Sequence, residues 1–156
     1  MPITAMKPRK KVLAVASGGG HWIQLLRLTP AFVDSEVVFV GVSSSYRSQV
    51  AKYKFYSVND GTRWNKIGLI KSAFKLAWLN WKEKPDVVVS TGAAPGYLAI
   101  RLGRLFGAKT IWLDSMANVE SLSMSGAMVG RHADLWLTQW PDLERPEGPY
   151  YRGSVL

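Results

Sequence analysis

The stretch Lys11–Leu28, KVLAVASGGGHWIQLLRL, decides the fold of this chain. It opens with a short apolar run, Lys11–Ser17, which is typical of a strand buried on both faces of a sheet. Three glycines interrupt the run, and apolar residues then return at mostly helical spacing over His21–Phe32. A strand that passes through a glycine-rich turn into a helix is the first part of a βαβ unit.

The rest of the chain repeats this alternation of strand and helix. Further strands are expected at Glu36–Val42, Phe55–Val58, Asp86–Thr91, Thr110–Leu113 and Leu135–Thr138, and further helices at Trp64–Lys84, Ala94–Phe106 and Leu122–Arg131. The pattern predicts an α/β fold, a Rossmann-like and mostly parallel sheet with helices on both faces. We expect one domain over residues 11–156, preceded by a basic tail over residues 1–10.

The composition excludes several classes of protein site. The 156 residues carry a formal net charge of +9 and no cysteine, which excludes disulfides, cysteine-ligated zinc and thiol nucleophiles. Residues 1–85 hold 14 Lys and Arg against 4 Asp and Glu, which suggests that the basic half meets an anionic surface; the alternative is a solvated face that aids solubility. The start has no apolar core and no run approaches the ~20 residues of a membrane span, so we expect neither a signal peptide nor a spanning helix.

Ligands of parallel α/β sheets bind at the carboxyl ends of the strands. The residues placed there first are Ser17, Gly18, Gly19 and Gly20, together with Thr91 and Gly92. Glycines let the backbone approach a ligand closely, and the helix N-terminus that follows favours a phosphate or another acceptor group. Ile23 stands where a dinucleotide fingerprint needs glycine, and the GK[ST] of a Walker loop is absent.

His21 is the first candidate for a catalytic base, because it opens the helix on this edge and can take a proton near neutral pH. The alternative is a histidine that only bonds to the backbone. Asp114 and Glu120 are the other candidate bases, or else acids favoured at a strand end and in a first helical turn. Asn118 and Ser121 are expected to cap the helix that leads to Arg131 or to contact a ligand. Two further candidate binding residues are Ser123 and Ser125; no metal-ligand set is visible.

The predicted helix Trp64–Lys84 carries a row of large apolar residues on one face. Trp64, Phe74, Trp78 and Trp81 belong to this row, and Lys71 and Lys75 flank it. Tryptophan beside lysine is typical of a helix that lies in a membrane interface. The alternative is a crossover helix that buries these rings against the sheet, so both membrane contact and core packing remain open here.

Three segments together resemble known glycosyltransferases. Ser17–Leu28 is similar to the opening of the GGH glycosyltransferases, including the N-terminal domain of MurG, and Pro85–Ser115 resembles that family's middle strand–helix–strand. The segment Val119–Glu144, VESLSMSGAMVGRHADLWLTQWPDLE, resembles the asparagine-linked glycosylation protein fourteen family. Eukaryotic members carry an N-terminal membrane anchor, whereas this chain begins MPITAMKPRKK.

The resemblance implies the N-terminal half of a GT-B glycosyltransferase, which binds the acceptor. A partner chain would then hold the UDP-sugar donor, so no cofactor is expected on this chain. The acceptor would be linked to polyprenyl diphosphate, and the complex would lie peripherally on the cytoplasmic face of a membrane, with the bacterial inner membrane as the expected site. The alternatives are a stand-alone nucleotide-binding α/β enzyme and a basic nucleic-acid-binding module; we expect no nucleic-acid partner, since the apolar row suits lipid better.

Overall fold

A seven-stranded parallel sheet forms the centre of the molecule in a computed structural model that describes residues 7–62 and 64–155. The strand order is β3-β2-β1-β4-β5-β6-β7, and every neighbouring pair is parallel. The strands are β1 (Lys11–Val15), β2 (Glu36–Gly41), β3 (Lys54–Ser57), β4 (Val87–Ser90), β5 (Lys109–Leu113), β6 (Leu135–Thr138) and β7 (Tyr150–Tyr151). The predicted fold class is confirmed by this sheet and its helices.

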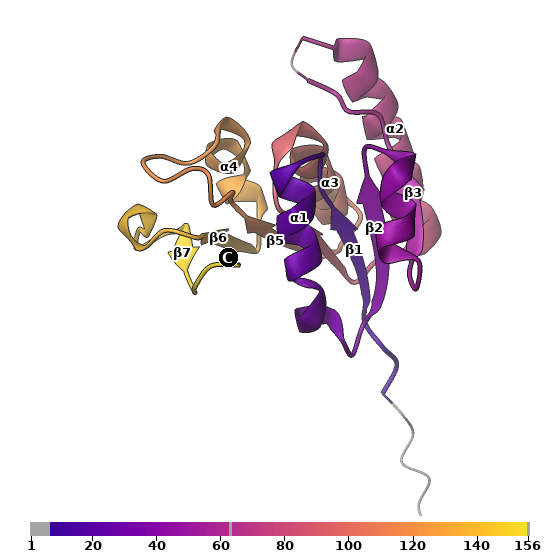
Figure 1. Cartoon of the computed structure of the whole chain (residues 1–156), viewed down its shortest axis with the longest axis horizontal. Coiled ribbons are helices and arrows are strands. Elements are labelled where there is room, and N and C mark those ends of the chain that lie inside the picture. Colours follow the sequence, from indigo (N-terminus) through magenta and orange to yellow (C-terminus); the bar gives the residue numbers. More distant parts are fainter. Residues whose placement is uncertain (1–6, 63, 156) are drawn as a thin grey trace, which may run out of the picture.

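Helices cover both faces of the sheet (Figure 1). On one face lies α1 (Gly20–Arg27), and on the other lie α2 (Lys66–Glu83) and α3 (Ala93–Leu105). A shorter helix, α4 (Met124–Val129), packs against α3 and β5. Four 3₁₀ segments complete the described elements: η1 (Thr29–Phe32), η2 (Ser44–Val50), η3 (Gly130–His132) and η4 (Pro141–Leu143).

Two apolar clusters form the core, one on each face. Leu13 and Val15 of β1 point into the cluster under α2 and α3, while Ala14 and Ala16 point into the cluster under α1. Successive side chains of a strand alternate between faces, so a continuous apolar run fills both clusters at once. Trp112 is fully buried and belongs to the first cluster.

Most element bounds lie within two residues of the predicted ones, α2 and α3 included, and the larger differences are at two helices. The expected helix His21–Phe32 is divided into α1 and η1, because Pro30 has no N–H to donate and disfavours helical geometry in the residue before it. The expected helix Leu122–Arg131 begins only at Met124 and ends in η3. The segments η2 and η4 were not predicted, since neither has a helical apolar period.

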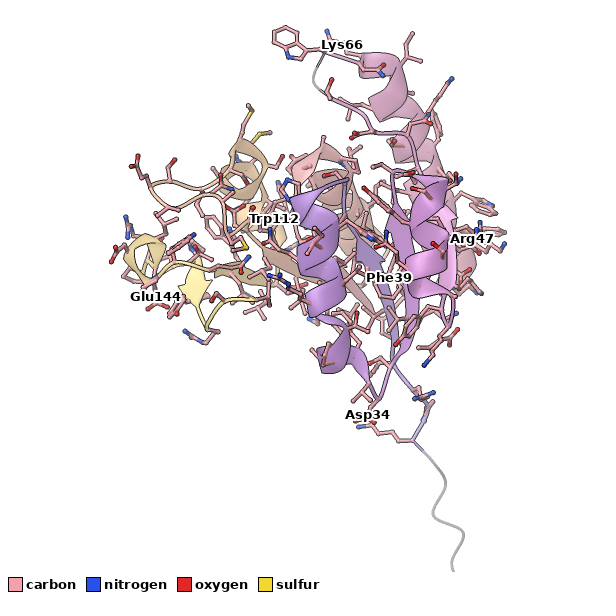
Figure 2. All side chains as sticks on the ribbon, in the orientation of Figure 1. Asp34, Phe39, Arg47, Lys66, Trp112 and Glu144 are labelled. Carbon is pink, nitrogen blue, oxygen red and sulfur yellow. The ribbon has the colours of Figure 1, made fainter. Side chains whose placement is uncertain are left out.

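The first turns of α2 extend beyond the carboxyl edge of the sheet (Figure 1). Figure 2 shows Phe39 and Trp112 among the interior side chains, whereas Lys66 lies at the far end of α2. Within the described residues, no helix has the length and apolar character needed to cross a bilayer. The predicted basic tail falls partly outside the description, which begins at Lys7; Arg9 donates from Nη2 to the Val33 carbonyl oxygen at 3.2 Å.

Candidate functional site

The carboxyl ends of β1 and β4 bring the glycine turn and Thr91 together. These two strands are neighbours in the sheet, and the chain leaves them on opposite sides, toward β2 and toward β5. Such a switch point opens a crevice between the loops that follow the two strands. Ser17 and Gly18 follow β1 there, and Thr91 and Gly92 follow β4.

His21 and Thr91 bond to each other across this switch point. The His21 ring atom Nδ1 lies 3.0 Å from the Thr91 carbonyl oxygen, and the Thr91 hydroxyl donates to the His21 carbonyl oxygen at 2.6 Å. A carbonyl oxygen only accepts, so Nδ1 carries the proton and Nε2 of the neutral ring keeps its lone pair. In the described part of the chain no hydrogen-bond partner is found for Nε2 of this half-buried side chain. The imidazole is therefore oriented to accept a proton.

Gly92 makes room for the imidazole. Its φ is +148°, a region that L side chains rarely adopt, and a β-carbon there would overlap Nδ1 and Cε1 of His21. The next residue, Ala93, also has a positive φ of 63°, which costs a non-glycine residue about 1–2 kcal/mol. Strained backbone of this kind is found preferentially at functional sites.

The glycine turn is supported from the other side by η2. Gly19 has a φ of +62° and donates its N–H to the Tyr46 hydroxyl at 3.2 Å. Tyr46 stacks on Trp22 of α1 with ring centroids 4.7 Å apart, and the Trp22 Nε1–H donates to Gln49 at 3.0 Å. Gly19 and Gly20 are exposed, and the Gly20 N–H at the start of α1 remains open to an anionic or hydroxyl-bearing ligand.

Asp114 lies at the end of β5 and is buried in a hydrogen-bonded cage. Its Oδ1 accepts from Trp112 Nε1 at 3.1 Å and from the Ser123 hydroxyl at 2.6 Å, and its Oδ2 accepts from the Ser123 N–H at 3.0 Å and Asn118 Nδ2 at 3.4 Å. Ser123 in turn caps α4 by accepting from the Gly126 N–H at 2.9 Å. A β-carbon at Gly126 would overlap Asp114. This geometry favours a positioning role for Asp114 over that of a base.

The remaining predicted site residues separate into two groups. Asn118 and Ser123 are held at Asp114, whereas Glu120 and Ser121 lie exposed in a bend before α4. The expectation that Asn118 or Ser121 caps the helix and that Glu120 occupies its first turn is wrong, because the cap is Ser123. Ser125 is half-buried in the first turn of α4.

A buried amide network beneath the site was missed in the sequence. Gln24 of α1 donates to the Ser115 hydroxyl at 3.3 Å and accepts from the Met116 N–H at 3.1 Å. Gln139, after β6, donates to Gln24 Oε1 and to the Asp114 carbonyl oxygen. The network fixes α1 against the loops that follow β5 and β6. The position of Gln139 at a strand end was the available signal, but its partner could not be read from one sequence.

The apolar row of α2 is exposed. The exposed fractions are 84% for Trp64, 74% for Phe74 and 64% for Trp81, and Ile67, Ile70 and Trp78 are also exposed. The face toward the sheet carries smaller or polar residues instead: Gly68, Ser72, Leu76, Leu79, Asn80 and Glu83. Core packing of the row, the alternative left open above, is therefore wrong. Five large apolar side chains on α2, with Trp64 just before the helix, form a surface patch of the kind that marks an interaction site.

Other titratable groups lie away from the site. His132 has a lowered pKa because of burial and the neighbouring positive charges of Arg101, Arg131 and Arg104. Among the described residues, no group of three His, Cys, Asp or Glu side chains could hold a metal ion. The chemistry available at the switch point is therefore that of an imidazole, backbone N–H groups and hydroxyls.

A family model described as "Oligosaccharide biosynthesis protein Alg14 like" matches residues 54–154. The UDP-N-acetylglucosamine transferase subunit alg14 of Schizosaccharomyces pombe is 33% identical over 104 residues, which cover 62% of this chain and 47% of that protein. The human UDP-N-acetylglucosamine transferase subunit ALG14 is 24% identical over 178 residues, which cover 93% of this chain and 82% of that protein.

Among solved structures, Acinetobacter baumannii MurG resembles this chain with a TM-score of 0.73 at 15% sequence identity. The match covers 93% of this chain and 45% of that chain. The matched regions thus span less than half the length of the fission-yeast relative and of MurG. At 15% sequence identity, the similarity to MurG shows a shared fold and nothing about activity.

Proposed function

Because the chain belongs to the family of Alg14-like oligosaccharide biosynthesis proteins, we propose that it is the acceptor-binding subunit of a UDP-sugar glycosyltransferase. The resemblance noted in the sequence is confirmed at the level of family and fold. Two relatives are named as subunits of a UDP-N-acetylglucosamine transferase, which supports both the activity and a separate donor-binding chain. In this proposal the partner holds the UDP-sugar, and this chain holds no cofactor.

The observation that carries the proposal is the orientation of His21 by Thr91. With its proton on Nδ1, the imidazole presents Nε2 beside the exposed glycine turn. We expect Nε2 to take the proton from the attacking hydroxyl of the acceptor. The acceptor oxygen bonds to the anomeric carbon of the donor sugar while the bond from that carbon to the diphosphate oxygen breaks, and UDP leaves with the electron pair. The glycine turn, Thr91 and Gly92 are the candidate acceptor-binding groups.

The exposed apolar row of α2 supports attachment to a membrane. Its rings suit the headgroup region, and Lys71, Lys75 and Lys82 follow one flank of the row. Each lysine near an anionic surface contributes about 1 kcal/mol to attraction. The acceptor in the proposal is a polyprenyl-diphosphate-linked sugar, whose lipid stays in the bilayer at the cytoplasmic face while its sugar reaches the switch point.

Transfer with and without a partner tests the activity. The chain is co-expressed with candidate donor-domain glycosyltransferases from the same genome, and transfer from labelled UDP-sugars to a polyprenyl-diphosphate-linked acceptor is measured. We expect transfer by the complex and none by this chain alone. His21→Ala is expected to lower turnover by roughly 10²–10⁴, the usual range for a general base, with the melting temperature and the complex unchanged. Turnover near that of the wild type would remove His21 from the chemistry.

Flotation with vesicles tests the membrane contact. Phe74 and Val33 are exposed to similar degrees, 74% and 71%, so Phe74→Ser and Val33→Ser form a matched pair on and off the row. Full burial of a phenylalanine is worth about 1.5–3 kcal/mol, so Phe74→Ser should weaken vesicle binding by roughly tenfold or more. Val33→Ser should bind as the wild type does. Equal binding by both variants would exclude the α2 row as the contact.

A further inference from the structure

A polar groove lies between α2 and the carboxyl ends of β2 and β3. Lys71 and Lys75, one helical turn apart, line one side, and Ser44, Ser57 and Asn59 line the other. The groove has a volume of about 320 Å³, the volume of roughly ten water molecules at ~30 Å³ each. No acidic side chain is among the described residues that line it. We call it the lysine groove.

Within the described residues, the lysine ammonium groups and serine hydroxyls of the lysine groove form no ion pair or hydrogen bond. Lys71 and Lys75 are exposed, and neither forms an ion pair with any residue in 7–62 or 64–155. Lys82, the next basic residue along this side of α2, differs because its ammonium lies 4.7 Å from the Trp78 ring centroid. The Asn59 carbonyl accepts from the Ser72 hydroxyl at 2.6 Å, which fixes the backbone of the groove's floor to α2.

The groove lies between the two features that the proposed function uses. Val42 lines the groove and also lies beside the glycine turn, since a β-carbon at Gly18 would be 3.5 Å from Val42 Cγ2. On its other side the groove borders the apolar row, because Lys71 lies one helical turn from Ile67 and Phe74, and Lys75 one turn from Trp78. A ligand that spans from the row to His21 on this route passes the two lysines.

Resting on the proposed function, we propose that the lysine groove binds the diphosphate group of the lipid-linked acceptor. Such a molecule has a hydrocarbon chain, a diphosphate and a sugar in this order, which is the order of the apolar row, the groove and the switch point. Two full charges with hydroxyl and amide donors suit a diphosphate. The glycine turn offers only the partial charge of a helix N-terminus, so it suits a diphosphate less well. In this proposal the glycine turn binds the sugar of the acceptor.

The test compares vesicles of neutral phosphatidylcholine that contain either a polyprenyl diphosphate or the same surface charge as phosphatidylglycerol. Lys71→Gln/Lys75→Gln is compared with Lys52→Gln/Lys109→Gln, which removes equal charge from exposed positions off α2. On both kinds of vesicle the first variant loses the general attraction of two lysines, so the groove is tested by the excess. We expect the first variant to lose about 30-fold more affinity for the diphosphate vesicles than for the phosphatidylglycerol vesicles, the equivalent of ~2 kcal/mol for two specific hydrogen bonds. The second should keep wild-type affinity. Inorganic diphosphate should compete with vesicle binding by the wild type and by this control, but not by Lys71→Gln/Lys75→Gln.

An equal loss on phosphatidylglycerol vesicles, or an equal loss in both variants, would overturn the proposal in favour of general charge attraction. Sugar transfer by the complex separates this inference from the proposed function. An unchanged acceptor KM in Lys71→Gln/Lys75→Gln, with transfer intact, would overturn the groove alone. In a further outcome, Lys71→Gln/Lys75→Gln selectively loses diphosphate binding, but no complex of the wild-type chain transfers sugar. That outcome would support the groove as a diphosphate site and refute the proposed glycosyltransferase function.

Discussion

Replacing Asp114 with asparagine exchanges one of its two accepting oxygens for an NH₂ group that cannot accept. With the NH₂ group at Oδ2, the N–H groups of Ser123 and Asn118 lose their acceptor. With the NH₂ group at Oδ1, the Ser123 hydroxyl can turn and accept, but the buried Trp112 Nε1–H is stranded. At least one buried donor is unpaired in either orientation, which costs about 1–3 kcal/mol.

The bonds that remain in Asp114→Asn also lose the negative charge that strengthens them, by roughly twofold. We therefore expect a total loss of about 2–4 kcal/mol in the free energy of unfolding. For a domain of this size that lowers the melting temperature by roughly 4–16 °C. Transfer by the complex should fall only as far as the folded fraction does.

Thermal and denaturant unfolding, followed in parallel with transfer, decide between the two roles of Asp114. Asp142 is an exposed acid in η4, so Asp142→Asn is the charge-matched control and should melt as the wild type does. If Asp114→Asn melts as the wild type does while turnover falls a hundredfold or more, the cage does not stabilise α4. In that case the carboxylate would be the base instead of His21.

Two further changes test other contacts. Gly92→Ala should lower stability by about 1–3 kcal/mol and lower transfer, because a β-carbon overlaps the His21 ring at a φ suited to glycine; a wild-type melting curve with full transfer would contradict this. Tyr56 donates to Glu83 at 2.6 Å, and this bond raises the pKa of Tyr56 to about 12. The usual pKa of tyrosine is ~10. The stability of the wild type should therefore fall as the pH rises from ~10 to about 12. Tyr56→Phe should cost about 1.5–3 kcal/mol at neutral pH and abolish this alkaline loss in denaturant titrations. Burial raises the pKa of Glu83, but the hydrogen bonds from Tyr56 and two lysines lower it overall. The stability that these bonds contribute should therefore be lost as acid protonates the carboxyl. A free energy of unfolding that does not change in acid would refute that account.

Strands β1 and β2 were predictable because their apolar runs fill both core clusters, and β4 because its three valines are half-buried or buried. Each predicted strand lies within two residues of the observed one, since burial on both faces leaves little freedom in which residues form it. The helices were less predictable where two signals compete. Asn118, Ser121 and Ser123 are all good N-cap residues within six positions, and the choice falls on Ser123 because Asp114 holds its N–H and hydroxyl.

The exposure of α2 could not be decided from its periodicity. A row of large apolar residues normally faces the sheet, yet the sheet side of α2 includes Ser72 and Asn80, while Phe74 and Trp81 face away. Small and polar residues suffice there because α2 packs closely on α3, while Leu76 and Leu79 supply its apolar contact with the sheet. Sequence spacing identifies a helical face, but not the side of the helix that the rest of the chain covers.

The contact that defines the candidate site was likewise outside the reach of one sequence. His21 was singled out by its place after the glycines, but Thr91 lies 70 positions away. Their bond depends on β1 and β4 being neighbours, which follows from strand order and not from local pattern. The positive φ of Ala93 was equally hidden, because alanine favours helical geometry and Ala93 is the first residue of α3.

The pairing of β1 with β4 has a consequence for the order in which the molecule assembles. Val12 pairs with Val37 on one side, 25 positions later, but with Val87 on the other, 75 positions later. Closing the longer loop costs more chain entropy, and contacts between distant residues form slowly. The strands on either side of this seam can pair locally first. In refolding we therefore expect the helical signal to recover before His21 reaches Thr91, so that the site is the last part of the sheet to form.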